Sequence, residues 1–251
     1  MMANTLTTSA HSICASFILI PSMDGELQSL KRKASKIRTI LAKEYGPKVV
    51  ELDADPLDTL VETILSQNTT DKNSSRAFGA LKASYHSWES MRGESPKKIA
   101  KIIRSGGLAS IKAERILSAL DFIKSERGNL DLNFLRGMSP EDAEQWLGRI
   151  KGVGPKTRSI VLLFSLGMPA FPVDTHIHRV TKCLGLIGHK TSREKAQTEL
   201  ARLVPVEDFY SFHINIIEHG RAVCQARKPR CGVCRISSLC DYYDRLAKAQ
   251  N

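Results

Sequence analysis

The chain has 251 residues, of which 42% are hydrophobic and 25% charged, a composition typical of a globular protein with one large core or two smaller ones. Its 37 Lys and Arg residues outnumber its 26 Asp and Glu residues and give a formal net charge of +11, which favours a polyanionic partner such as a nucleic acid. The apolar runs from Ile13 to Ile20 and from Ser159 to Phe164 are far shorter than the roughly 18 residues of a membrane span, so we expect no membrane partner.

The N-terminal segment, residues 1–25, is rich in Ser and Thr and contains no Lys or Arg. This composition fits neither a secretory signal nor an organelle transit peptide, and we predict a disordered leader. From Leu27 to Tyr45, apolar residues recur at helical spacing with basic residues on the other faces. The pattern predicts an amphipathic helix that ends at Gly46-Pro47, with a basic side that is typical of an ordinary solvated helix face.

Helix start and stop signals recur between residues 55 and 148. Asp55-Pro56, Ser95-Pro96 and Ser139-Pro140 each place a capping side chain before a proline suited to the first helical turn. Gly106-Gly107 stops the second of these helices. The sequence contains no strand-period alternation of any length and no internal repeat at a fixed period. It therefore predicts an all-α fold.

Two connections in this region hold residues with more than one interpretation. The run of small polar residues from Ser66 to Asp71 is typical of a loop or a helix cap. The amide groups of Gln67 and Asn68 carry both donors and acceptors, so this run is also suited to reading the edges of bases. Leu108, directly after the two glycines, is either exposed at a turn or packed in the core.

The stretch from Leu147 to Val180 organises the rest of the chain. Its first half predicts a helical hairpin: one helix, a tight turn at Gly152-Val153-Gly154, and a second helix from Pro155 to Phe164. The two glycines permit positive φ angles and close backbone approach. Backbone N–H groups at the start of the second helix are suited to binding a phosphate. The basic residues around them add to this site: Arg149, Lys151, Lys156 and Arg158.

A lysine and an aspartate bracket this stretch, because Asp174 follows Lys156 by eighteen residues and opens a further helix. As a neutral amine, Lys156 can act as a nucleophile; otherwise it contacts a phosphate. Asp174 can stabilise a developing positive charge and assist proton transfer. Its simpler role is to cap the helix that it opens.

Four cysteines lie within 17 residues near the C-terminus, with the spacing C-x6-C-x2-C-x5-C: Cys224, Cys231, Cys234 and Cys240. The absence of a secretory signal argues against a disulfide framework. Zinc is the alternative metal, but only Cys231 and Cys234 are closely paired, whereas an iron–sulfur cluster tolerates uneven spacing. Cys14 and Cys183 are interpreted as ordinary thiols. The loop between the first two cysteines carries basic residues suited to phosphates: Arg227, Lys228 and Arg230.

The hairpin LGRIKGVGPKTRSIVLL, the following FPVDTHIHRV and the cysteine spacing together resemble the endonuclease III family of helix-hairpin-helix (HhH-GPD) DNA glycosylases. The resemblance covers about residues 27–245. It implies a two-lobed fold, with a six-helix barrel lobe at residues 56–167 and a second lobe, residues 26–55 plus 168–251, in which the four cysteines hold a 4Fe-4S cluster. Duplex DNA would lie across the cleft between the lobes, with the damaged base rotated out of the stack.

This resemblance also implies roles for single residues. Lys156 matches the catalytic lysine of the family and Asp174 its catalytic aspartate. Asn68, preceded by Gln67, matches the glutamine that fills the gap left by the flipped base, and Leu108 matches the leucine that wedges beside the unpaired partner base. The implied activity is that of a bifunctional DNA glycosylase and apurinic/apyrimidinic (AP) lyase. It removes oxidised pyrimidines in base excision repair, through a lysine Schiff base and β-elimination.

Two alternatives stay open. One is a mismatch or 5-methylcytosine-type glycosylase of the same superfamily, although mismatch enzymes normally lack the hairpin lysine and the plant 5-methylcytosine enzymes are much larger. The other is a non-catalytic helix-hairpin-helix DNA-binding protein. We expect a monomer that binds duplex DNA containing damaged bases or abasic sites. Its expected location is the nucleus or an organelle in a eukaryote, or the nucleoid and cytoplasm in a prokaryote.

Overall fold

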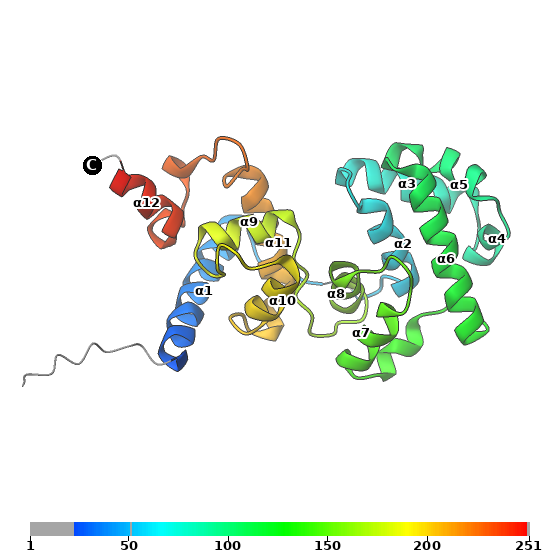
Figure 1. Cartoon of the computed structure of the whole chain (residues 1–251), viewed down its shortest axis with the longest axis horizontal. Helices are drawn as coiled ribbons and strands as arrows, with labels where there is room; N and C mark the ends of the chain where they lie inside the picture. The colour runs from blue at the N-terminus through cyan, green and yellow to red at the C-terminus, as the bar shows by residue number, and fades with distance from the viewer. Residues whose placement is uncertain (1–22, 51, 250–251) are drawn as a thin grey trace, which may run out of the picture.

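The computed structural model describes residues 23–50 and 52–249, and these form helices joined by turns, with no strand among them. The all-α prediction is confirmed. Two groups of helices stand side by side in Figure 1. The predicted leader lies outside the described residues except for its last three, and there the prediction was wrong, because the first helix already begins at Met23. Within the described ranges, no helix combines the length and the apolar character needed to cross a bilayer.

The first group, which we call the barrel lobe, surrounds one hydrophobic core that runs from Leu57 to Met168. Its long helix α6 packs against α5 and α2, and α2 in turn packs against α3 and α8. The bounds of its helices are α2 Pro56–Ser66, α3 Asp71–Ser84, α4 Trp88–Arg92, α5 Pro96–Ile102, η1 Arg104–Gly106, α6 Ala109–Arg127, η2 Asn133–Gly137, α7 Pro140–Gly148 and α8 Pro155–Phe164.

Side-chain caps fix where these helices begin. The carboxylate of Asp55 accepts hydrogen bonds from the N–H groups of Leu57 and Asp58, at 2.8 and 3.0 Å. Ser95 and Ser139 cap α5 and α7 in the same way, each followed by a proline. A cap of this kind contributes about 1 kcal/mol to helix stability. The start positions that the sequence predicts for α2, α5 and α7 are therefore confirmed.

The second lobe combines the N-terminal helix with the last third of the chain. Helix α1 lies along α11, and its residues Ile37 and Leu41 are fully buried in the second core. This packing explains the amphipathic pattern of α1, whose basic face remains outside. The bounds of the helices in this lobe are α1 Met23–Tyr45, α9 Thr175–Cys183, α10 Arg193–Ala201, η3 Val206–Asp208, α11 Phe209–Ala222, η4 Cys231–Val233, η5 Ser237–Leu239 and α12 Asp241–Ala249.

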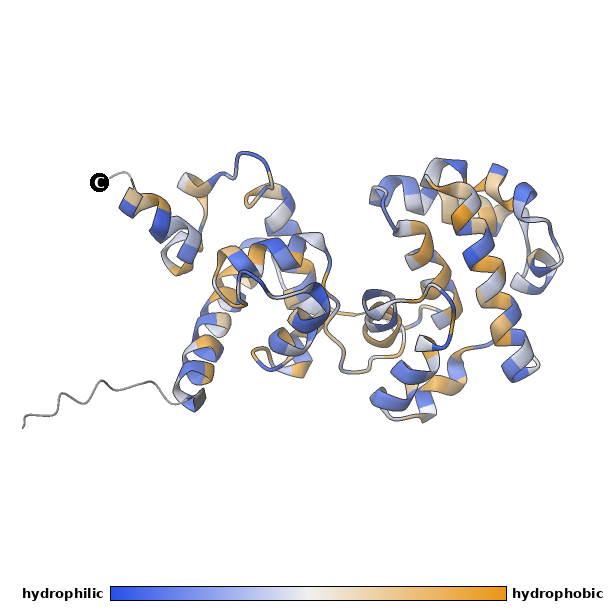
Figure 2. Cartoon of the chain, in the orientation of Figure 1, coloured by the Kyte–Doolittle hydropathy of each residue, from blue (hydrophilic) through white to orange (hydrophobic). Residues whose placement is uncertain are grey.

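Helix α8 belongs to both cores. Val161 and Leu162 are buried in the barrel core, whereas the next residue, Leu163, is buried in the core of the second lobe. Figure 2 shows the helices of both lobes divided into apolar and polar stripes, as expected when each packs against its neighbours with one side. The N-terminus of α8 is thus held at the junction of the two lobes.

The packing of α1 predicts that the second lobe depends on it. Replacement of Ile37 by alanine removes a fully buried side chain from the α1–α11 contact and should lower the free energy of unfolding by about 2–5 kcal/mol. Lys36→Ala is the matched control, because Lys36 is exposed on the same turn and its loss should cost less than about 0.5 kcal/mol. Urea denaturation of both variants measures the difference. Equal stability of the two variants would contradict the assignment of α1 to this core.

Candidate functional site

The predicted hairpin is formed by α7, the turn at residues 149–154 and α8. Gly152 takes a φ of +85°, and the N–H of Val153 donates to the carbonyl of Ile150 at 3.1 Å. Gly154 has a φ of −82° and serves as the N-cap of α8. Only Gly152 therefore needs the positive φ that the sequence analysis expected of both glycines. The turn is exposed apart from Ile150 and Val153, so the backbone around Gly152 is open to a ligand.

The expected ring of four basic side chains around the start of α8 is only partly present. Arg149 donates to Glu126 of α6 at 2.7 Å, and Arg158 lies 3.4 Å from Glu144 of α7. Glu126 lies on a neighbouring helix and Glu144 on the first helix of the hairpin itself, and they draw both arginines into ion pairs. Lys151 stays exposed at the turn.

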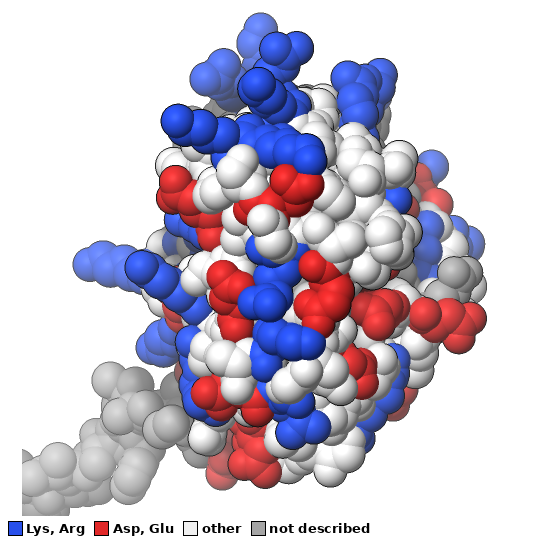
Figure 3. All heavy atoms as spheres, turned by 90° about the vertical axis from the view of Figure 1, so that its right-hand side faces the viewer, with Lys and Arg blue, Asp and Glu red and all other residues white. Residues whose placement is uncertain are grey.

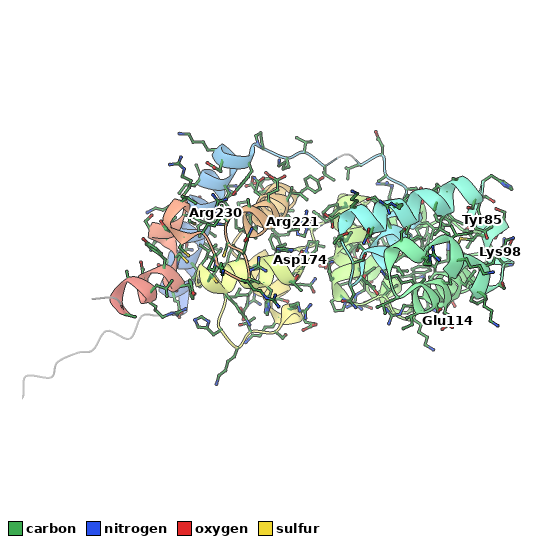
Figure 4. The ribbon with its side chains drawn as sticks, turned by 90° about the horizontal axis from the view of Figure 1, so that it is seen from above. Tyr85, Lys98, Glu114, Asp174, Arg221 and Arg230 are labelled. Carbon is green, nitrogen blue, oxygen red and sulfur yellow. The ribbon has the colours of Figure 1, made fainter. Side chains whose placement is uncertain are left out.

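Lys156 and Asp174 line the same cleft, of about 410 Å³, between the two lobes. Lys156 enters it from the first turn of α8, and Asp174 from the N-terminus of α9. Gln67 and Asn68 line it from the barrel lobe. Figure 4 shows Asp174 on the side of the second lobe that faces the barrel lobe. Four residues singled out from the sequence are thus brought together in one cleft.

The structure shows that Asp174 does cap its helix. Its Oδ1 accepts a hydrogen bond from the N–H of Ile177 at 2.7 Å. The bond fixes the carboxylate at the wall of the cleft, so capping and a chemical role are compatible.

A buried histidine that the sequence analysis missed lies close to both residues. The Nδ1 of His213 in α11 is 3.0 Å from the carbonyl oxygen of Pro172. Burial lowers the pKa of His213 to about 4; the charge of Asp174 opposes this shift and that of Lys156 adds to it. The imidazole is therefore neutral at pH 7. Its position in the run Phe-His-Ile gave no local signal, because the contacts come from distant segments.

An ion pair crosses the cleft. Nη2 of Arg221, in α11, lies 2.6 Å from Oδ2 of Asp71, at the start of α3. Both side chains also line the cleft with Lys156, and Figure 4 places Arg221 next to Asp174. Because both partners are at least half exposed, the pair contributes no more than about 1 kcal/mol.

Backbone strain is concentrated at the predicted DNA contacts. Within the described residues, the non-glycine residues with positive φ are Asn68 at 52°, Leu108 at 47° and Lys228 at 57°. Each was singled out from the sequence for contact with DNA. The left-handed conformation costs such a residue about 1–2 kcal/mol, and strain of this kind gathers at functional sites.

Leu108, Asn68 and Gln67 differ in exposure and in side-chain contacts. The side chain of Leu108 is 52% exposed at a turn, which decides between the two interpretations of this residue. Asn68 is exposed too. The Oε1 of Gln67 instead accepts a hydrogen bond from Arg115 of α6 at 2.7 Å.

A second hollow, of about 540 Å³, adjoins the cleft and shares Ser66 and Asp71 with it. It is lined by Ile160 of α8 and Tyr210 of α11. Ile160 lies one helical turn, about 6 Å, beyond Lys156 along α8. Glu62 lines the hollow as well, and burial, with the charges of Asp58 and Asp71, raises the pKa of its carboxyl group. A flat polar ring attached near Lys156 could extend into this space.

The four clustered cysteines line a separate cavity of about 220 Å³ in the second lobe. Within the described residues, no three His, Cys, Asp or Glu side chains converge on a point that could hold a single metal ion. The cysteines surround a space instead. Burial raises the pKa of the Cys234 and Cys240 thiols, so thiolates there require the positive charge of a metal.

The chemistry of four thiols around one cavity fits an iron–sulfur cluster. Zinc gathers four thiolates at about 2.3 Å around one ion, whereas a cluster of several irons occupies a larger cage. Cys183 also lines the cavity, and its carbonyl oxygen accepts a hydrogen bond from the Cys240 thiol at 3.2 Å, which the sequence analysis did not anticipate. Arg227 and Lys228 are exposed on the loop beside the cavity.

Comparison with known proteins identifies relatives of the chain. The family model described as HhH-GPD superfamily base excision DNA repair protein matches residues 61–206. Endonuclease III of a Synechocystis strain is 35% identical over 87% of this chain and 96% of its own length, and endonuclease III of Haemophilus influenzae is 33% identical over 86% and 98%. A candidate DNA glycosylase of Arabidopsis thaliana is 42% identical over 68% of this chain, and the match spans 59% of that plant protein.

The fold is shared with solved structures of endonuclease III on DNA. A non-covalent endonuclease III–DNA complex matches with a TM-score of 0.75 and 26% identity, over 87% of this chain and 98% of that one. A trapped covalent endonuclease III–DNA intermediate matches with the same TM-score and identity, over 86% and 98%. The chain therefore belongs to the HhH-GPD superfamily of base excision DNA repair proteins and, within it, to the endonuclease III family of DNA glycosylases.

Proposed function

We propose that this protein is a bifunctional DNA glycosylase and AP lyase that removes oxidised pyrimidines from duplex DNA. The observation that carries the proposal is the cleft in which Lys156 and Asp174 meet from opposite lobes. The likeness to a trapped covalent endonuclease III–DNA intermediate supports it. Because one chain supplies both residues, we propose that the protein acts as a monomer.

DNA binding follows from the surfaces beside the cleft. The hairpin turn offers backbone N–H groups and Lys151 to one phosphate, and Arg227 and Lys228 offer charge from the second lobe. Figure 3 shows the end of the barrel lobe that is turned away from the second lobe. There Lys and Arg gather alone only along the upper edge and elsewhere alternate with Asp and Glu. The net charge of +11 favours DNA overall, and the hairpin and the basic loop orient it.

The chemistry begins when the neutral Nζ of Lys156 attacks C1′ of the rotated nucleotide. The glycosidic bond breaks, and the base leaves with the electron pair and takes a proton from water. Asp174 stabilises the positive charge that develops on the sugar and accepts the proton that the lysine nitrogen loses. The sugar ring opens as Asp174 returns that proton to O4′, which leaves a Schiff base between C1′ and Nζ. Loss of a proton from C2′ then expels the 3′ phosphate by β-elimination.

The base itself would occupy the second hollow. Because Ile160 lines this hollow one turn of α8 beyond Lys156, we propose that a ring bound there would have its C1′ near the amine. Glu62 and Thr63 line this hollow with carboxyl and hydroxyl groups, which can form hydrogen bonds with the carbonyl and N–H groups of a pyrimidine. Asn68 would fill the gap left in the duplex, and Leu108 would wedge beside the unpaired base.

In this proposal Cys224, Cys231, Cys234 and Cys240 hold a 4Fe-4S cluster. The cluster supplies iron–thiolate bonds that tie the C-terminal segments together. The chain's own contribution is to present the basic loop between the first two cysteines, which Arg179 braces through hydrogen bonds to the Cys224 carbonyl at 3.0 and 2.8 Å.

Borohydride trapping tests the lyase. Wild-type protein mixed with abasic-site duplex should form a covalent adduct, because reduction fixes the Schiff base, and Lys156→Ala should form none. Lys97→Ala is the control, since Lys97 is exposed on α5 and does not line the cleft. Denaturing gel electrophoresis measures the adduct. No adduct from the wild type, with tight DNA binding, would instead favour the non-catalytic DNA-binding alternative.

Asp174→Asn tests the role of the carboxylate. Asparagine still caps a helix, so the fold should persist, whereas single-turnover release of an oxidised pyrimidine should fall by about 100-fold or more. Affinity for the same duplex, measured by fluorescence anisotropy, should stay close to that of the wild type. A loss of affinity as large as the loss of rate would show that Asp174 acts through structure alone.

The purified protein should be yellow-brown, with a broad visible absorbance band and an iron content proportional to the amount of protein. Cys231→Ser should lose both colour and iron because it removes one of the four ligands. Cys183→Ser should keep them, although Cys183 lines the same cavity. A colourless wild-type protein with zinc at full occupancy would contradict the cluster. Loss of iron in Cys183→Ser would show that Cys183 is needed to hold the metal.

A further inference from the structure

Helix α6 buries a lysine that the proposed chemistry does not use. Lys112 is 1% exposed and is among the largest fully buried side chains of the described residues. Its Nζ donates hydrogen bonds to the carbonyl oxygens of Leu65, at 2.6 Å, and Gly106, at 2.8 Å. Within the part of the chain that the structure describes, it forms no ion pair with a carboxylate. Burial, with the charge of Arg115 in addition, lowers the pKa of its ammonium group.

A charge held in a protein interior without a counter-ion is costly, so the groups that the Lys112 ammonium contacts must offset this cost. Both of its acceptors are carbonyls at helix ends. Leu65 lies in the last turn of α2, and Gly106 is the last residue of η1. Such carbonyls lack a partner within their own helix and carry partial negative charge. One ammonium group therefore donates hydrogen bonds to unpaired carbonyls at the C-terminal ends of two helices.

The chain continues from both ends into the segments proposed to enter DNA. Asn68 follows Leu65 by three residues, and Leu108 follows Gly106 by two. Both lie in the strained left-handed region, with φ of 52° and 47°. Gly106 is tightly packed, since a Cβ added there would lie 3.2 Å from the Cβ of Ala77 and 3.9 Å from the carbonyl oxygen of Leu65. The two segments are thus held against each other, with the Lys112 ammonium between their carbonyls.

We propose that Lys112 is a positioning residue that sets the spacing between Asn68 and Leu108, so that both side chains enter the duplex together when a base is rotated out. The inference rests on the proposed function. Lys112 itself touches neither DNA nor the reacting atoms. It acts through the two carbonyls, and Arg115, three residues further along α6, holds the neighbouring Gln67 in a similar way.

Base release and abasic-site cleavage by the same site should depend on Lys112 to different extents. Release of a paired base requires its extrusion from the stack, which costs a few kcal/mol and needs the gap to be filled. An abasic site has no base to extrude, so cleavage there depends on Lys156 and Asp174 alone. Wrong spacing of Asn68 and Leu108 should therefore slow base release and spare the lyase. A merely structural role would affect both alike.

Lys112→Met keeps the unbranched stem and removes the donors. Under single-turnover conditions it should release an oxidised pyrimidine paired in duplex DNA about 100-fold more slowly than the wild type, the scale of a 1 Å misplacement. Its lyase rate on abasic-site duplex should stay within about threefold of the wild type. Fluorescence of 2-aminopurine placed opposite the lesion, which reports unstacking of the partner base, should also be weaker at saturating protein.

Matched variants separate the outcomes. Ile116→Val, buried in the same helix, lowers stability without touching the ammonium and should keep the wild-type ratio of the two rates. If Lys112→Met does not fold, as judged by circular dichroism, Lys112→Arg decides: it keeps the charge with a longer group, so it should slow base release more than the lyase. An unchanged ratio in the folded Lys112 variant overturns the inference. A wild-type protein that releases no base overturns the proposed function instead.

Discussion

The packing of α8 into two cores is the constraint on which the rest of the structure depends. Leu162 and Leu163 are neighbours in sequence, yet one is buried in the barrel lobe and the other in the second lobe. A helix anchored on both sides cannot shift toward one lobe without leaving a cavity in the other, which costs several kcal/mol. Lys156, in the first turn of α8, is therefore fixed relative to Asp174, which the second lobe presents from the start of α9.

Locally unfavourable features gather on the side of the molecule proposed to meet DNA. Asn68, Leu108 and Lys228 hold left-handed backbone conformations, and Lys112 holds a buried charge behind the first two. A rigid core tolerates such features because the surrounding contacts over-determine them. Their concentration in the segments proposed to contact DNA argues that they serve binding rather than folding.

Local features could be predicted from the sequence, and long-range contacts could not. The start of α2, the hairpin turn and the cap at Asp174 depend on residues a few positions apart, so spacing reveals them. The ion pair between Arg149 and Glu126 joins residues 23 positions apart. The hydrogen bond from Lys112 to Leu65 joins residues 47 positions apart. No periodicity encodes such contacts. For the same reason the sequence placed Lys156 and Asp174 near each other only through a family resemblance.

The ion pair between Arg221 and Asp71 also joins the lobes, at 2.6 Å, but it contributes less to stability. Because it is exposed, it contributes at most about 1 kcal/mol and is screened by salt. The apolar packing of α8 is larger and insensitive to ionic strength. The spacing of the lobes is therefore set by buried contacts, and the charged groups around the cleft are free to exchange partners. This division keeps the attacking amine in place while the charges around it respond to a polyanion.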